Sequence, residues 1–191
     1  MAATPSNMLA LGTPMPEFEL PDFNGSTVKS TAFSSASAIL VVFLCPHCPF
    51  VRHTRTEIGR LARDYQPRGL VVFGINPNDT TAFPQDGPDG MKEEAKIAGY
   101  PFPYLQDESQ DVAKLYHAAC TPDFFLFDRD RKLVYRGQLD SSRPGNNIPV
   151  TGTDLRAALD AVLTGNSPSA LQKPSIGCSI KWKPGNAPES F

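Results

Sequence analysis

Cysteine is scarce in this chain, and so are long apolar runs and any excess of charge. Four cysteines among 191 residues are too few for a fold that disulfides hold together. The balance of 18 basic against 20 acidic residues gives no electrostatic argument for a nucleic-acid partner. The longest apolar run is far shorter than the ~20 residues that span a bilayer, so we expect no membrane partner.

The N-terminal segment also lacks the features of an export signal. Residues 1–20 have neither a charged start nor a sustained apolar stretch. We therefore expect a cytoplasmic protein, whose thiols the cell keeps reduced. In that compartment a Cys-x-x-Cys pair is typical of catalysis or metal binding rather than of a structural disulfide.

One such pair, Cys45-Pro46-His47-Cys48, follows an unbroken apolar stretch at 38–44. That stretch predicts a buried central strand, and apolar residues at helical spacing predict a helix from about 48 to 65. The start of a helix favours a thiolate and lowers the pKa of a cysteine there. We expect an exposed Cys45 with a lowered pKa that attacks a disulfide, and a sheltered Cys48 that resolves the product. A protonated His47 would lower the pKa of Cys45 further.

The other elements follow from the same kinds of pattern. Strands 38–44 and 70–76 are expected to be parallel across a right-handed crossover, and a turn at 128–130 predicts an antiparallel pair. The loop at 77–90 is long enough to be functional or mobile. We predict strands at 18–20, 27–28, 102–105, 124–127 and 133–136, a hairpin turn at 22–25, and helices at 91–98, 112–116 and around 155–162.

The C-terminal segment differs from the rest of the chain in composition. Proline, serine and glycine become frequent after residue 165, so we expect one domain at 1–165 and a tail at 166–191. Within the tail, Ile176, Cys178, Ile180 and Trp182 alternate with small or polar residues. This period of two predicts an extended segment, 174–182, that packs these four side chains on the domain from one face. We expect Trp182 to be its largest apolar anchor.

The predicted order of elements, with Cys-x-x-Cys at the first strand–helix junction, is that of an α/β thioredoxin-like fold. It has a central mixed sheet flanked by helices, an N-terminal hairpin and the extended tail. Three blocks of sequence resemble the redoxin branch of the thioredoxin superfamily, the alkyl hydroperoxide reductase/thiol-specific antioxidant (AhpC/TSA)-like proteins. They are the G-x-x-x-P-x-F-x-L-x-D-x-x-G pattern at 12–25, residues 41–53 around the cysteine pair, and Thr121-Pro122 before strand 124–127.

This resemblance implies a thiol–disulfide oxidoreductase that needs no cofactor. Its substrates would be protein or small-molecule disulfides, and a cellular dithiol system would reduce it again. The resemblance also implies that the bond before Pro122 is cis, and that the backbone of Thr121 pairs with the extended chain of a substrate. Pro46, His47, Thr121 and Pro122 would then support Cys45 and Cys48.

Two other functions compete with this interpretation. The first is a thiol peroxidase that acts on hydroperoxides through a sulfenic acid on Cys45. Peroxiredoxins place proline seven and threonine or serine three residues before the reactive cysteine, and this chain has Ala38 and Val42 there. The second is a non-enzymatic metal carrier that uses Cys45, Cys48 and a histidine. We expect no resident metal, because a structural zinc site usually needs a second close cysteine pair.

The other two cysteines also have two interpretations. Buried free cysteine is most often a small apolar packing residue, and this applies to Cys120 and Cys178. Cys120, however, lies two residues before Pro122, beside the expected site. Cys178 lies on the face of the tail that packs on the domain, so either of them is a candidate auxiliary redox residue.

Overall fold

The sheet at the centre of this computed structural model, which describes residues 3–189, has five strands in the order β6-β5-β4-β8-β9. β4 (Ala38–Phe43) and β5 (Leu70–Asn76) are parallel, as is β6 (Tyr104–Gln106), while β8 (Asp123–Phe127) and β9 (Leu133–Gly137) are antiparallel to their neighbours. All six residues of β4 are buried, as expected for a central strand covered on both faces.

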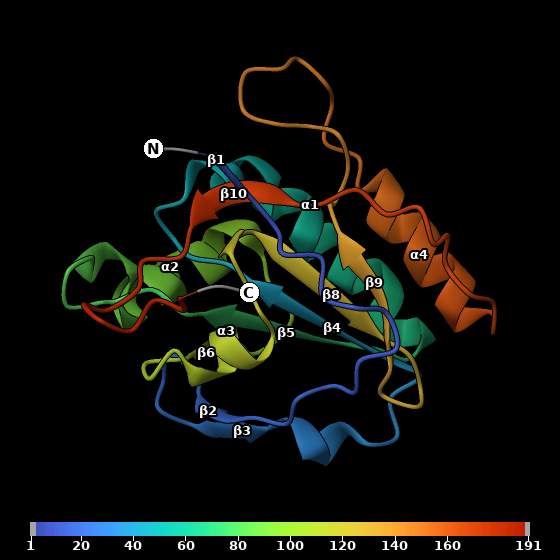
Figure 1. The fold of residues 1–191 in the computed structure, drawn as a ribbon, viewed down its shortest axis with the longest axis horizontal. Coiled ribbons are helices and arrows are strands. Elements are labelled where there is room, and N and C mark those ends of the chain that lie inside the picture. Colours follow the sequence, from blue (N-terminus) through green and yellow to red (C-terminus); the bar gives the residue numbers. More distant parts are fainter. Residues whose placement is uncertain (1–2, 190–191) are drawn as a thin grey trace.

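Helices cover one face of this sheet and the N-terminal hairpin covers the other (Figure 1). On the first face, α1 (Pro49–Tyr65), α2 (Pro88–Ala98) and α4 (Thr153–Leu163) supply residues to one core. On the second face, α3 (Asp111–Leu115) and the hairpin of β2 (Glu19–Pro21) and β3 (Thr27–Lys29) pack on another. This arrangement confirms the predicted thioredoxin-like fold.

A second, three-stranded sheet lies at the end of the central one. It contains β1 (Ala3–Pro5), β10 (Ile176–Ser179) and β7 (Cys120–Thr121), with β10 in the middle and antiparallel to both neighbours. Figure 1 shows β1 and β10 side by side at this end of the molecule. β1 was not predicted, because no pattern within these three residues marks a strand and its pairing partner β10 lies far along the chain. The division of the chain at residue 165 stays a prediction.

The tail packs on the domain, but the expectation of one shared face is wrong. Cys178 belongs to the core that contains the cysteine pair, whereas Ile180 and Trp182 pack in the core on the other face of the sheet. The strand ends at Ser179, and beyond it the chain crosses the end of the central sheet. Trp182 is only partly buried, whereas Ile180 is 3% exposed. The alternation therefore does not continue past the end of the strand.

Smaller differences concern the limits of elements. α2 begins three residues earlier than predicted, because Pro88 occupies its first turn. β6 begins two residues later and ends one residue later than predicted. The loop 77–90 contains a short 3₁₀ turn at Pro84–Asp86. No helix among residues 3–189 is long and apolar enough to cross a membrane.

Candidate active site

The cysteine pair lies where β4 ends and α1 begins. Cys48 is the residue before the first turn of α1, and Pro49 occupies the first helical position, where proline costs no hydrogen bond. Arg52 donates through Nε to the Pro46 carbonyl at 2.8 Å and so fixes the loop between the two cysteines. Cys48 therefore lies directly at the start of the helix, and Cys45 lies three residues before it.

Both thiols contact Thr121, which precedes the bond to Pro122, and that bond is cis as predicted. The Cys45 sulfur lies 3.4 Å from the Thr121 hydroxyl, and the Cys48 sulfur lies 3.1 Å from the Thr121 carbonyl oxygen, to which its protonated form donates. The structure thus brings Cys45, Cys48, Thr121 and Pro122 together from two segments that are more than seventy residues apart.

The expectation of an exposed Cys45 is wrong in this structure. Cys45 is 1% exposed and Cys48 is 0% exposed. Two segments close this end of the domain, the loop 77–90 and the tail, and they are bonded to each other. Lys181 donates its backbone N–H to the Asn78 side chain at 2.9 Å, and its carbonyl accepts from the N–H of Asp79 at 2.8 Å.

The pKa values of the two cysteines also differ from those expected. The pKa of Cys48 is lowered to about 5, first because Cys45 donates a hydrogen bond to it and then because Thr121 and the Val51 N–H also do; burial opposes this shift. The pKa of Cys45 is raised, first by that same bond to Cys48 and then by burial and the negative charge of Asp86. The reduced pair therefore holds one thiolate, on Cys48. The prediction of a lowered pKa for Cys45 is wrong because the neighbouring Cys48 sulfur, burial and the charge of Asp86 all oppose a thiolate on Cys45.

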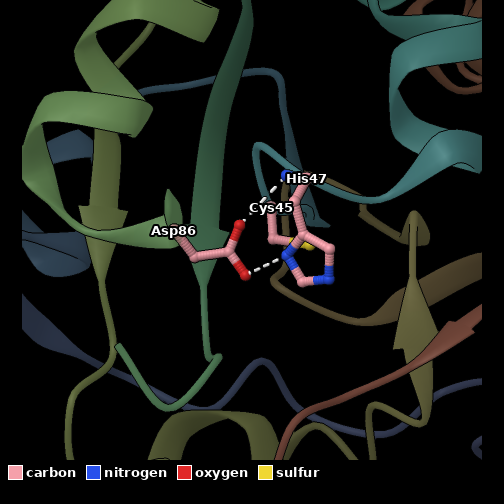
Figure 2. A group of neighbouring side chains, drawn as sticks. All are labelled: Cys45, His47 and Asp86. Atoms are coloured by element: carbon pink, nitrogen blue, oxygen red, sulfur yellow. Dashed lines mark hydrogen bonds and ion pairs between the residues drawn. The ribbon is translucent and has the colours of Figure 1, made fainter. Parts of the chain in front are cut away.

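His47 has a partner that the sequence did not reveal. Its backbone N–H donates to Asp86 Oδ1 at 3.0 Å, and its Nδ1 lies 2.5 Å from Asp86 Oδ2. Figure 2 shows this carboxylate facing both the backbone and the ring of His47, with Cys45 beside them. The ring also stacks on Phe83, with 5.6 Å between centroids. His47 is thereby held in one orientation beside the cysteine pair.

Asp86 itself is fully buried and is fixed by two asparagines of the same region. Asn78 Nδ2 donates to its carboxylate at 2.8 Å, and Asn76 Nδ2 donates to its carbonyl at 2.7 Å. A buried carboxylate needs such partners to stay charged. Only the length of the loop 77–90 hinted at a function here, because nothing in the local sequence pairs residue 86 with residue 47.

Cys45, His47 and Asp86 also form a group whose ligand atoms all lie within 4.8 Å of one another. This differs from the predicted metal set of Cys45, Cys48 and a histidine, because Asp86 takes the place of Cys48. His53, on α1, lies 2.7 Å through Nε2 from the Ser142 hydroxyl. The three groups that lie close enough together to hold a metal ion are thus a thiol, an imidazole and a carboxylate.

The edge of β7 is already occupied. The resemblance implied that Thr121 pairs with a substrate's extended chain, but here β10 pairs with β7, and Cys178 lies opposite Thr121. Cys178 lies in the same core cluster as Cys45 and Cys48, and its pKa is raised to about 12, first by burial and then by the Cys48 thiol. Cys120 instead directs its thiol to the Pro122 carbonyl at 3.7 Å, and burial raises its pKa.

Two buried carboxyls near the site were also missed. Burial raises the pKa of Glu94 and of Asp123 to about 7 in each case. Glu94 accepts from the Tyr104 hydroxyl at 3.1 Å, and Asp123 follows Pro122 and accepts from the Ala119 N–H at 3.2 Å. Both titrate near neutral pH, where a carboxyl can accept or release a proton.

The fold and the site, with two thiols at the first strand–helix junction beside a cis-proline loop, define a thioredoxin-like protein. A sequence model of the AhpC/TSA family matches residues 11–136. The chain therefore belongs to the AhpC/TSA family, as its resemblance indicated.

Solved structures support the same placement. The chain is 52% identical to a hypothetical protein, SMc02350, from Sinorhizobium meliloti, with 95% of this chain and 100% of that chain covered and a TM-score of 0.93. It is 55% identical to an uncharacterized conserved protein from Geobacillus kaustophilus, with 97% and 98% covered and a TM-score of 0.94.

A more distant likeness is the thioredoxin domain of a thiol-disulfide oxidoreductase from Bacteroides vulgatus. It is 20% identical, with 67% of this chain and 88% of that chain covered and a TM-score of 0.57, and it supports the fold alone. A search of curated protein sequences gave no match.

Proposed function

We propose that this chain is a cytoplasmic thiol–disulfide oxidoreductase whose redox centre is the Cys45–Cys48 dithiol. The observation that supports this most is that both sulfurs contact Thr121 beside the cis-proline, and the pKa of Cys48, at the start of α1, is lowered. A thiolate is the form that reacts with a disulfide. Two thiols within bonding reach provide both the attacking and the resolving sulfur.

In the proposed reaction, the proton of Cys45 first moves to Cys48 along their hydrogen bond. The Cys45 thiolate attacks one sulfur of the substrate disulfide, a mixed disulfide forms, and the other substrate sulfur leaves as a thiolate that takes up a proton. Cys48 then gives up its proton and attacks Cys45, which releases the second substrate thiol and leaves a Cys45–Cys48 disulfide. A cellular dithiol system returns the pair to the reduced state.

His47 and Asp86 would hold the substrate side of this site. The His47 side chain is 13% exposed and Asp86 is fully buried, so the imidazole is the part of the pair that meets solvent. A histidine beside a reacting sulfur can supply or accept the proton of the leaving thiol. Because β10 fills the edge of β7, we infer that the substrate disulfide approaches from the His47 side rather than by strand addition at Thr121.

Activity assays on three single variants test this proposal. We expect Cys45→Ser to abolish turnover of insulin and of oxidised glutathione, and Cys48→Ser to accumulate mixed disulfides. Cys120→Ser is the matched control, because its thiol bonds its own loop, and it should retain wild-type turnover. Unchanged turnover in Cys45→Ser would reject the proposed function.

The peroxidase alternative is supported by family membership and by the Thr121 hydroxyl 3.4 Å from the Cys45 sulfur. In that reaction Cys45 attacks the peroxide oxygen and becomes a sulfenic acid, and Cys48 condenses with it to release water. Hydroperoxide consumption that exceeds disulfide turnover, and is lost in Cys45→Ser, would favour it. Stoichiometric metal in the purified protein, lost in Asp86→Asn, would favour a metal carrier.

A further inference from the structure

We propose that Cys178 is a third redox cysteine, which exchanges with Cys48 and moves the disulfide from Cys45–Cys48 to Cys48–Cys178. This inference rests on the proposed function and adds a residue and a step to it. Cys178 lies in the tail, 130 positions beyond Cys48, and the structure places it in the same core cluster as the cysteine pair.

The register of the strands directs Cys178 toward the pair. Residues directly opposite each other in an antiparallel ladder point to the same face, and neighbours along a strand point to opposite faces. Cys178 lies opposite Thr121, and the Thr121 hydroxyl contacts the Cys45 sulfur. Cys178 therefore faces the site, it shares a buried core cluster with Cys48, and each of these two thiols shifts the pKa of the other.

The same register excludes Cys120 as the partner. Cys120 lies opposite Ser179, so its side chain leaves β7 on the face away from Thr121 and Cys178. Two cysteines whose Cβ atoms point apart cannot form a disulfide without movement of the backbone. Of the other three cysteines, Cys45 and Cys48 share a core cluster with Cys178, and Cys120 does not.

A glycine next to Cys178 allows this close approach. A Cβ atom added to Gly177 would lie 1.9 Å from the Thr121 carbonyl oxygen, so a larger residue would push the strand away from β7. Ser175, two residues earlier, donates through its hydroxyl to the Pro122 carbonyl at 2.6 Å. Ile180, beyond Cys178, donates its N–H to the Ala119 carbonyl at 3.1 Å, so the tail is hydrogen-bonded to the chain around the cis-proline on both sides of Cys178.

The exchange step keeps atoms and electrons in balance. Starting from the Cys45–Cys48 disulfide, the Cys178 sulfur attacks the Cys48 sulfur, and a Cys48–Cys178 bond forms while the Cys45–Cys48 bond breaks. The electron pair leaves on Cys45, which takes the proton that Cys178 gives up, so no external oxidant or reductant is needed. Cys45 becomes a free thiol again, while the protein keeps one disulfide.

Disulfide mapping by peptide mass spectrometry tests the contact in Cys45→Ser, which retains Cys48, Cys120 and Cys178. Oxidised glutathione should first form a mixed disulfide with Cys48, which Cys178 then displaces to give a Cys48–Cys178 crosslink. The double variant Cys45→Ser/Cys120→Ser should give the same crosslink. A control with Cys48→Ser should leave Cys178 unpaired.

Alkylation of wild-type protein that carries one disulfide per chain tests the exchange step. Because exchange frees Cys45, iodoacetamide should label Cys45, and in Cys178→Ser that labelling should fall about tenfold or more. If Cys178→Ser does not fold, the same labelling is measured in Cys178→Ala. Absence of the crosslink in Cys45→Ser, with a Cys45–Cys48 disulfide present in wild type, overturns this inference alone. Absence of the Cys45–Cys48 disulfide in wild type overturns the proposed function and the exchange together.

Discussion

The site of the thiolate in the reduced protein leads to the sharpest prediction. The pKa of Cys48 is lowered to about 5 and that of Cys45 is raised. The pKa of Cys178 is raised to about 12, and that of Cys120 is also raised. A titration of thiolate absorbance at 240 nm between pH 3 and pH 8 should therefore show a single step, of one thiolate per chain, with its midpoint near pH 5.

The free energy of this thiolate follows from the shift. At pH 7 a group with a pKa of about 5 is two units past its midpoint, so charge on Cys48 stabilises the reduced, folded protein by about 3 kcal/mol, at ~1.4 kcal/mol per unit. A disulfide has no such charge to stabilise. The pair should therefore be more oxidising, by roughly 60 mV, than a dithiol with ordinary pKa values.

Single variants assign the step to its sulfur. Cys48→Ala should remove the step near pH 5. Cys45→Ala should keep one thiolate but move its midpoint upward, because the hydrogen bond from Cys45 is the largest cause of the lowered pKa of Cys48. A step that persists at the wild-type midpoint in Cys48→Ala would place the thiolate on Cys45 and refute the reasoning.

Three further predictions concern stability and access to the site. Because the folded-state pKa of Cys48 lies below its ordinary value of 9.0, its contribution should decline as pH falls from about 9 toward 5. The difference in unfolding free energy between reduced wild type and Cys48→Ala should therefore shrink over this pH range. Glu94 and Asp123 titrate in both proteins, so their opposite effect cancels in the difference. A difference that stays constant with pH would contradict the prediction. Asp86→Asn should lower the free energy of unfolding by about 1.5–3 kcal/mol, since it removes charge-assisted bonds to His47, and it should slow the turnover of insulin. Asp130→Asn, on an exposed turn, is the control and should do neither. Gly177→Ala should cost about 1–3 kcal/mol by overpacking against Thr121 and should speed alkylation of Cys45, whereas Ser179→Ala, exposed on the same strand, should do neither. Equal alkylation rates in these last two variants would show that the tail does not shield Cys45.

The elements of the central sheet were readable because their signals are local. The apolar stretch at 38–44 is long enough to require burial on both faces, and β4 has no exposed residue. The helical spacing after Cys48 gave α1 to within one residue of its observed start at Pro49. The position of the cysteine pair between them followed directly, and the cis bond before Pro122 followed from the family resemblance.

Predictions for the tail were only partly correct, for a physical reason. A period of two identifies an extended segment, but it does not state how far the strand continues or what it crosses. Cys178 and Ile180 fit one alternation, yet they lie in different cores, because the strand ends between them. The expected substrate edge at Thr121 was likewise filled by the tail itself, which depends on pairing between residues far apart in the chain.

The sequence by itself determined the order of strands and helices, the thioredoxin-like layout and the place of Cys45 and Cys48 within it, since each depends on apolar spacing over a few neighbouring residues. The tertiary structure alone decided that Asp86 binds His47, that Thr121 contacts both sulfurs, and that Cys178 lies in the core of the cysteine pair. Those features depend on hydrogen bonds and burial shared by residues 39 or more positions apart, and no local pattern in the chain records which of them come together.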